Sequence, residues 1–124
     1  MDSPLKERTK QYAIRVIRVY LALPKNALGQ VLGKQLLRSG TSVGAQYREA
    51  LHGRSRAEFA SKLESSLQEL EESLYWLELI MEFGLLPEKR LRGLIAEASE
   101  LRAMAISSLK TLRAVRTPIQ RSAL

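Results

Sequence analysis

The chain has 124 residues, a net charge of +7 and no cysteine. This length fits one domain, and the lack of cysteine excludes disulfides, cysteine-ligated zinc and cysteine nucleophiles. No stretch approaches the roughly 20 apolar residues needed to cross a bilayer, and the charges of residues 1–10 exclude a signal peptide. We therefore expect a cytoplasmic protein with no membrane contact.

The positive charge is unevenly distributed along the chain. Residues 1–54 hold ten Lys/Arg and three acidic residues, and residues 84–124 hold eight and three, whereas residues 55–83 hold two and seven. A basic protein of this kind favours an anionic partner, either nucleic acid or an acidic protein surface. The alternative is a solvated basic surface that binds nothing specific.

The first predicted helix covers residues 4–23. Ser3-Pro4 is a typical helix start, and Pro24 ends the pattern. Apolar residues spread over more than half of the helix circumference, although packing in one bundle needs a stripe of only about 100°. We infer that this helix also contributes to a subunit interface, and we assign to it Tyr12, Val16 and Tyr20. A narrow basic arc of the same helix includes Arg8, Arg15 and Arg18.

The second predicted helix covers residues 27–52. Its middle is a run of small and β-branched residues that includes two glycines, each costing about 1 kcal/mol in a helix interior. Close approach of another helix at Gly40 and Gly44, which share one face, would compensate for this cost. A kink or a ligand site is the alternative, and we favour packing.

The third predicted helix covers residues 56–83. Ser55 and Glu58 have the spacing of a capping box, in which Glu58 reaches back to the Ser55 amide, and Gly84 is a typical residue after a helix end. An unbroken heptad pattern predicts a buried seam of Ala60, Leu63, Leu67, Leu70, Leu74, Leu77 and Met81. Beside it, Glu64, Glu71 and Glu78 recur every seven residues. We expect them to face basic residues of another helix or subunit, and we assign them to the subunit interface; a solvated acidic edge is the alternative.

The fourth predicted helix covers residues 87–116, starting at Pro87. Thr117-Pro118 is expected to stop it, leaving a basic tail over residues 117–124. Its outer basic arc comprises Arg92, Arg102, Lys110 and Arg113, with Arg116 at the edge. Four helices with short connections predict an all-α, antiparallel up-down four-helix bundle formed by a single domain of residues 1–124.

No catalytic or metal-binding pattern is complete. The segment 29–35 resembles a phosphate-binding loop but lacks the Ser or Thr after Lys34 and a preceding strand. Glu49 and His52 have the spacing of a di-iron ligand pair, but His52 is the only histidine, so the second pair that such a site needs is missing. Arg48 and His52 would suit a helical ribonuclease only weakly. We expect no enzymatic activity, no metal and no cofactor.

Three segments carry a resemblance to a known family. They are Arg38-Ser39-Gly40-Thr41-Ser42-Val43-Gly44-Ala45-Gln46-Tyr47-Arg48-Glu49-Ala50, Ser55-Arg56-Ala57-Glu58-Phe59 and Glu72-Ser73-Leu74-Tyr75-Trp76-Leu77-Glu78-Leu79. In this order they resemble the four-helix-bundle proteins encoded in 23S rRNA intervening sequences. The family often has Asn-Ile-Ala-Glu-Gly where this chain has residues 46–50. The same superfamily includes the accessory variability determinants of diversity-generating retroelements.

The resemblance implies a ring-like homopentamer of antiparallel bundles with a central channel and a strongly basic surface. It also implies that nucleic acid and a reverse transcriptase are candidate partners, because the accessory proteins bind both. No catalytic residues come with the family.

The leading functional hypothesis is a non-enzymatic homo-oligomer that binds RNA or DNA through phosphate contacts. The residues assigned to these contacts are the basic residues of the first and last helices: Arg8, Arg15, Arg18, Lys110, Arg113 and Arg116. The alternative is a scaffold or accessory subunit, for example of a reverse transcriptase, whose partner is a protein. An enzyme that depends on Glu49 or His52 is the third hypothesis.

Overall fold

The computed structural model describes the backbone of residues 3–123 and the side chains of residues 3–114. These residues form four helices and no strand. The helices are α1 (Pro4–Ala22), α2 (Ala27–Leu51), α3 (Arg56–Glu82) and α4 (Glu88–Ala123). The all-α class is as predicted, and the first three helices begin and end within one residue of the expected positions.

Local capping explains these boundaries. The side chains of Ser3, Asn26 and Ser55 accept hydrogen bonds from the amides of Leu5, Gly29 and Glu58, respectively. At the end of α3, Gly84 has a φ of 62°, a left-handed conformation that glycine adopts without strain.

The capping box at the start of α3 is formed only in part. Ser55 caps as expected, but the Glu58 carboxylate accepts a hydrogen bond of 3.4 Å from the amide of Arg54, not from that of Ser55. The chain bends at residues 54 and 55, which brings the earlier amide to the carboxylate.

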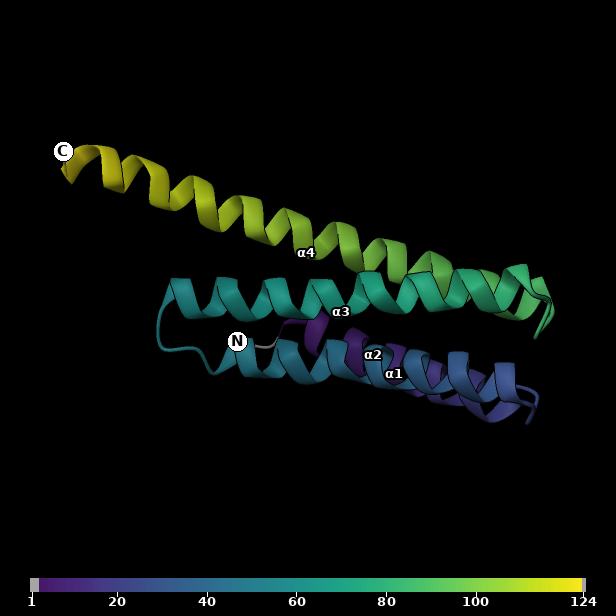
Figure 1. Cartoon of the computed structure of the whole chain (residues 1–124). Coiled ribbons are helices and arrows are strands. Elements are labelled where there is room, and N and C mark those ends of the chain that lie inside the picture. Colours follow the sequence, from purple (N-terminus) through teal and green to yellow (C-terminus); the bar gives the residue numbers. More distant parts are fainter. Residues whose placement is uncertain (1–2, 124) are drawn as a thin grey trace.

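The four helices surround one core in the order α1, α2, α3, α4 (Figure 1). Each helix runs antiparallel to its two neighbours, and the contact between α2 and α3 is the most extensive. Figure 1 also shows that α4 diverges from α3 towards its C-terminal end and projects beyond the other helices. The second half of α4 is therefore held less closely than the rest of the bundle.

The buried face of α3 is rotated from the predicted seam. Leu63, Leu70 and Leu77 are buried as expected, but Ala60, Leu67, Leu74 and Met81 are only half-buried. Their places in the core are taken by Ser66, Ser73 and Ile80. The two serines can occupy the core because their hydroxyls are satisfied inside the bundle, while the four half-buried residues pack against the edge of the core. Ser66 donates to the carbonyl of Val43 at 2.7 Å, and Ser73 donates to that of Leu70.

The glycines of α2 allow close helix packing, as predicted. A Cβ at Gly40 would lie 2.7 Å from Cγ2 of Val16 in α1, and one at Gly44 would lie 3.3 Å from the hydroxyl of Thr9. Both distances are shorter than ordinary van der Waals contact. The small-residue run is therefore the surface on which α1 packs.

The prediction that the fourth helix stops at Thr117-Pro118 is wrong. The helix continues through Pro118 to Ala123, so residues 117–123 are helical and not a frayed tail. A proline within a helix removes the hydrogen bond to the carbonyl four residues earlier. The alanines, arginines and glutamine around it are good or acceptable helix formers, and this segment projects from the bundle, where solvent can satisfy the freed carbonyl.

Candidate nucleic-acid interface

Arg8 is committed to an ion pair within the chain. Its Nη2 lies 2.7 Å from Oε1 of Glu97 and 3.2 Å from Oε1 of Glu100, and its Nε donates to the other oxygen of Glu97 at 3.1 Å. The hydrogen bond to Glu97 raises the pKa of Arg8 above its ordinary value. This geometry favours a role in holding α1 on α4 over the predicted phosphate contact.

Arg15 and Arg18 lie further along the same seam between α1 and α4, where a third basic residue joins them. Together with Arg90 of α4 they line a pocket of about 210 Å³, whose remaining walls are Val19 and Leu94. Among the side chains that the structure describes, no carboxylate lies within 4.0 Å of any of these three guanidiniums. These three arginines, which we call the α1–α4 arginine cluster, thus form a concentration of uncompensated positive charge.

Arg90 was not among the predicted contacts. It is the third residue of α4 and lies outside the basic arc that the helical periodicity defines. Only the antiparallel packing of the start of α4 on the end of α1 brings it to Arg15 and Arg18. The only signal in the sequence was the density of basic residues after Pro87.

The position opposite Arg15 on α4 is a glycine. A Cβ at Gly93 would lie 3.1 Å from Nη2 of Arg15, so the guanidinium rests against the α4 backbone. Arg15 follows Arg8 by two helical turns, and Gly93 precedes Glu97 by about one turn. Along this seam, the charge of Arg8 is neutralised by Glu97 and Glu100, whereas the charge of Arg15 has only Gly93 opposite it.

The basic residues of the second half of α4 face the acidic edge of α3. Arg113 pairs with Glu64 and Arg102 pairs with Glu71 in the same chain. Lys110 lines the groove of about 280 Å³ between these two helices. Glu64 and Glu71 were expected to face basic residues of another helix or subunit. In the structure they pair with another helix of the same chain. Glu78 is exposed, and the side chain of Arg116 lies outside the described residues.

The assignment to a subunit interface is wrong for two residues, because they lie in the core of the chain itself. Tyr12 and Val16 are fully buried. Tyr12 is drawn inward by a hydrogen bond to Ser73, and Val16 packs on Gly40. A wide apolar arc does not itself reveal which of its edges faces the bundle. Tyr20 is half-buried beside Gly33, where its Cδ1 would lie 3.0 Å from an added Cβ.

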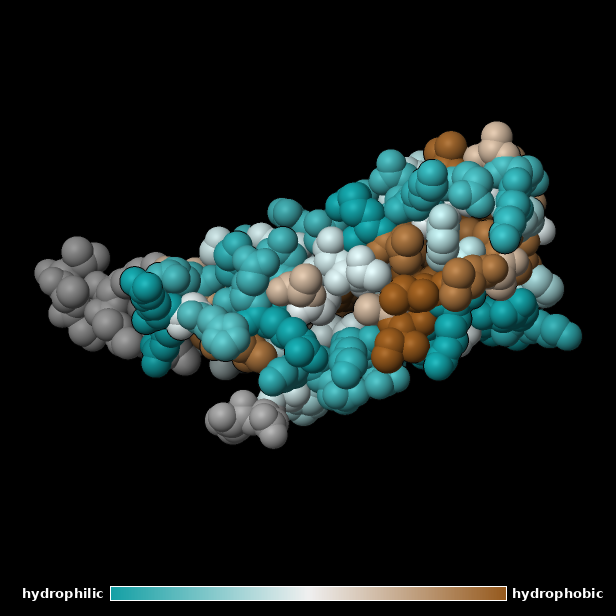
Figure 2. Space-filling model, turned by 90° about the horizontal axis from the view of Figure 1, so that it is seen from below, coloured by the Kyte–Doolittle hydropathy of each residue, from teal (hydrophilic) through white to brown (hydrophobic). Residues whose placement is uncertain are grey.

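The exposed apolar part of α1 lies on its outer face. Ile17 and Leu21 are 39% and 70% exposed, and Ile14 beside them is half-buried. Figure 2, which views the molecule from the side of α1 and α2, shows an apolar patch amid hydrophilic surface near the end where these helices are joined. We call Ile14, Ile17 and Leu21 the outer apolar face of α1. They belong to the wide apolar arc from which an interface was predicted.

The residues considered for catalysis are not assembled into a site. Glu49 pairs with Lys62 at 2.9 Å, and Arg48 and His52 are exposed at the end of α2. No group of three or more potential metal ligands occurs among the residues with described side chains. Within the same residues, no helix is both long enough and apolar enough to cross a membrane.

A family model described as 23S rRNA-intervening sequence protein matches residues 2–107 of the chain. The chain belongs to this family. The structure is also similar to the crystal structure of a Bacteroides thetaiotaomicron protein of unknown function from the S23 ribosomal protein family. The TM-score is 0.81 at 35% sequence identity, over 86% of this chain and 98% of that one. No curated protein matches the chain.

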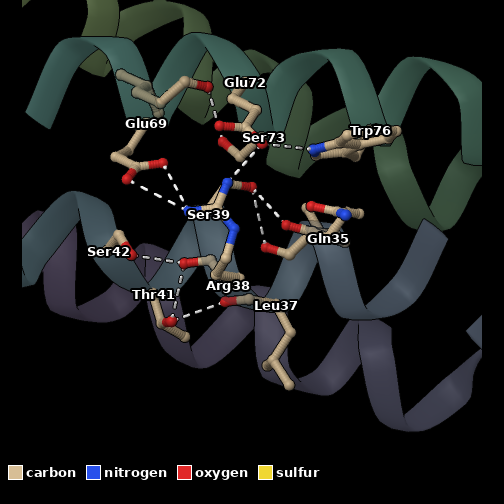
Figure 3. A network of polar contacts seen from close by, with 12 residues as sticks. Gln35, Leu37, Arg38, Ser39, Thr41, Ser42, Glu69, Glu72, Ser73 and Trp76 are labelled. Atoms are coloured by element: carbon tan, nitrogen blue, oxygen red, sulfur yellow. Dashed lines mark hydrogen bonds and ion pairs between the residues drawn. The ribbon is translucent and has the colours of Figure 1, made fainter. Parts of the chain in front are cut away.

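In this member of the 23S rRNA-intervening sequence protein family, the residues that carry the resemblance join α2 to α3. Figure 3 shows Arg38 reaching across to two carboxylates of α3, Glu69 and Glu72, while Trp76 donates to Glu72 at 3.3 Å. Ser39 is buried and donates to the carbonyl of Gln35 at 2.8 Å. The motif therefore has a structural role, and Arg38, whose charge is compensated, is not part of the candidate interface.

Proposed function

We propose that this protein is a non-enzymatic homo-oligomer that binds nucleic acid, with RNA as the expected ligand, through phosphate contacts. The observation that carries the proposal is the α1–α4 arginine cluster, in which Arg15, Arg18 and Arg90 line one pocket without a carboxylate partner. Arginine donates in a planar fork that matches phosphate oxygens. The net charge of +7 adds a long-range attraction for polyanions.

We take RNA as the expected ligand, and DNA, which presents the same kind of phosphate, is the alternative polyanion. The contacts we propose are to phosphates and not to bases, so little sequence preference is expected. Of the residues assigned from the sequence, Arg15 and Arg18 are the best placed. Lys110 would extend the basic surface, whereas the charge of Arg113 is paired with Glu64.

The outer apolar face of α1 supports the homo-oligomeric part of the proposal. Apolar side chains that no helix of the chain covers are typical of a subunit contact, and the family resemblance implies a pentamer. Copies arranged in a ring would repeat the arginine cluster, so that several weak phosphate contacts act together on one strand.

The test is an RNA-binding titration at several salt concentrations. Neutralising Z phosphate contacts on a single strand gives a slope of about −0.7Z for log K against log salt. We expect binding of a generic single-stranded RNA to weaken steeply between about 50 and 200 mM salt. The variant Arg15→Gln/Arg18→Gln/Arg90→Gln should bind more weakly and with a shallower slope.

The matched control removes three charges elsewhere. Lys34, Arg48 and Arg56 are exposed and have no carboxylate within 4.0 Å among the described side chains. The variant Lys34→Gln/Arg48→Gln/Arg56→Gln has the same net charge as the first and should retain most of the binding. Binding that is insensitive to salt, or equal loss in both variants, would refute a role for the cluster.

A protein-binding scaffold is the second candidate function, with a reverse transcriptase as one possible type of partner. It is favoured by two exposed aromatic residues near the end of α3, Tyr75 within the helix and Phe83 directly after it, which are 52% and 63% exposed, with Glu78 and Glu82 nearby in sequence. Exposed aromatic residues are common at the centres of protein interfaces. A protein that stays bound after nuclease has removed all nucleic acid, and that is released by Tyr75→Ser/Phe83→Ser, would favour this function.

A further inference from the structure

We propose that the α1–α4 arginine cluster is a site for a phosphate monoester, supplied by the phosphorylated 5′ end of an RNA strand. This inference rests on the proposed function, because it assumes phosphate recognition by the same arginines. It goes further in naming the kind of phosphate group and the part of the strand that the pocket takes.

The first argument is the change of charge along one seam. Where α1 meets α4 at Arg8, two carboxylates lie opposite, at 2.7 and 3.2 Å. Two turns later, α4 places Gly93 opposite Arg15 and then adds a further positive charge with Arg90. Like charges gathered without a counter-ion destabilise a structure, since each raises the electrostatic energy of the others. A bound anion would remove this cost.

The second argument is the amount of charge. An internal phosphodiester carries one negative charge and two free oxygens, whereas a phosphate monoester carries about −1.5 to −2 at pH 7 and three free oxygens. Three guanidiniums exceed the charge of one phosphodiester. Each can donate two parallel hydrogen bonds, so the cluster is better matched to the monoester in both charge and acceptors.

The third argument is the form of the pocket. At about 210 Å³ it has room for a phosphate group and part of the attached sugar, and two of its walls, Val19 and Leu94, are buried apolar residues. Apolar walls reduce the local screening by water and strengthen the attraction between the guanidiniums and an anion. The internal phosphates of a strand can cross a basic surface without a pocket, whereas a terminal phosphate can point into one.

The fourth argument is that α4 leaves space beside one of the three guanidiniums. Arg15 is half-buried, and its Nη2 lies where a Cβ of residue 93 would nearly touch it. An exposed glycine within a helix costs about 1 kcal/mol relative to alanine. At Gly93 this cost leaves space for the Arg15 guanidinium to lie beside α4 in the same pocket as Arg90, where its N–H groups can donate to a bound anion.

The experiment compares two RNA oligonucleotides of one sequence, labelled at the 3′ end and carrying either a 5′-phosphate or a 5′-hydroxyl. We expect the 5′-phosphorylated strand to bind about five- to tenfold more tightly, as one additional strong charged contact would give. The preference should fall between pH 7.5 and pH 5, because a phosphate monoester dianion takes up a proton near pH 6 and then carries only one negative charge.

Two variants locate the effect. Arg15→Gln/Arg18→Gln/Arg90→Gln should bind both strands equally, while Lys34→Gln/Arg48→Gln/Arg56→Gln should keep the preference of the wild type. Circular dichroism and thermal melting establish that both variants are folded. A cluster variant that keeps the full preference for the phosphorylated strand would overturn the assignment of the site.

A competition experiment distinguishes recognition of an RNA 5′ end from recognition of a free nucleotide. AMP should compete with the phosphorylated strand, with adenosine as its control, but more weakly than an unlabelled 5′-phosphorylated RNA. Equal binding of the two RNA strands by the wild-type protein overturns this inference and leaves the proposed function standing. Failure of both strands to bind overturns the proposed function as well.

Discussion

The hydroxyls of Tyr12 and Ser73 lie 2.7 Å apart in the centre of the bundle. They join α1 to α3, two helices that face each other across the core and are not neighbours in the ring of helix contacts. Ser73 donates its own proton to the carbonyl of Leu70, so Tyr12 is the donor in this pair. The two residues thus link opposite helices with all their hydrogen-bonding groups satisfied.

Replacing Tyr12 by phenylalanine should remove this bond without leaving an unsatisfied group, because Ser73 retains Leu70 as its acceptor. We expect Tyr12→Phe to lower the free energy of unfolding by about 0.5–1.5 kcal/mol in urea denaturation. Tyr75→Phe, at an exposed tyrosine, is the matched control and should change it by less than about 0.5 kcal/mol. An unchanged midpoint for Tyr12→Phe would mean that the hydrogen bond contributes nothing.

The same residue should make the protein sensitive to alkali. Burial raises the pKa of Tyr12 from 10.0 to about 12. Between these values the unfolded chain loses the Tyr12 proton and the folded chain keeps it, so stability falls as the pH rises. The expected slope is about 1.4 kcal/mol per pH unit. The difference in stability between wild type and Tyr12→Phe should therefore shrink or change sign between pH 10 and 12, and a constant difference would contradict the raised pKa.

Two glycine-to-alanine substitutions should have opposite effects on stability. At Gly40 a Cβ would lie 2.7 Å from Val16 in the core, and overpacking of this kind costs about 1–3 kcal/mol, more than alanine gains as a helix former. Gly93 is exposed, and only the flexible end of Arg15 is near it. We expect Gly40→Ala to lower the melting temperature and Gly93→Ala to raise it, with up to about 1 kcal/mol of added stability. A shift in the same direction for both would refute the packing argument.

The proposed oligomer should depend on the outer apolar face of α1. Burying a Leu or Ile side chain contributes about 1.5–3 kcal/mol, so Ile17→Lys/Leu21→Lys should weaken self-association by at least about a hundredfold. Sedimentation velocity measures the change, and circular dichroism shows whether the fold is kept. Ala96→Lys/Ser99→Lys, at two exposed positions of α4, adds the same charge as a control. A wild-type protein that is monomeric at about 100 μM would end this hypothesis.

The link between α2 and α3 through Arg38 should contribute modestly and in a pH-dependent way. The side chains of Arg38 and Glu72 are 50% and 37% exposed, so solvent screens the pair and we expect Arg38→Gln to cost about 0.2–1 kcal/mol at pH 7. The hydrogen bond from Arg38 lowers the pKa of Glu72 below 4.5. A carboxylate of this kind stabilises the fold above its unfolded pKa and ceases to do so as it is protonated.

The cost of Arg38→Gln should therefore disappear as the pH falls below 4.5, measured by urea denaturation at several pH values. Arg92→Gln is the control, because its pair with Glu88 is more exposed and should contribute almost nothing. A cost that persists unchanged at low pH would show that Arg38 acts through packing of its side chain and not through its charge.

The helix starts and the close packing of α2 could be predicted because they depend on nearby residues. A cap such as Ser55 lies within three residues of the amide that it accepts, and Gly40 and Gly44 mark a contact surface wherever their partner lies along the chain. The apolar periodicity identified the helices but misplaced the buried face of α3. It could not reveal that Ser66 and Ser73 would find hydrogen-bond partners inside the core, or that α4 would diverge.

The candidate site likewise has features that the sequence predicted and features that it could not predict. The amino-acid sequence by itself determined the four helices, the surplus of positive charge and the basic arc that contains Arg8 and Arg15. Only the tertiary structure decided that Arg8 is neutralised, Arg15 is not, and Arg90 joins it. The physical reason is that an arginine's charge is compensated by whatever lies opposite on another helix, here Glu97 at a separation of 89 residues, and helical periodicity carries no information about that distance.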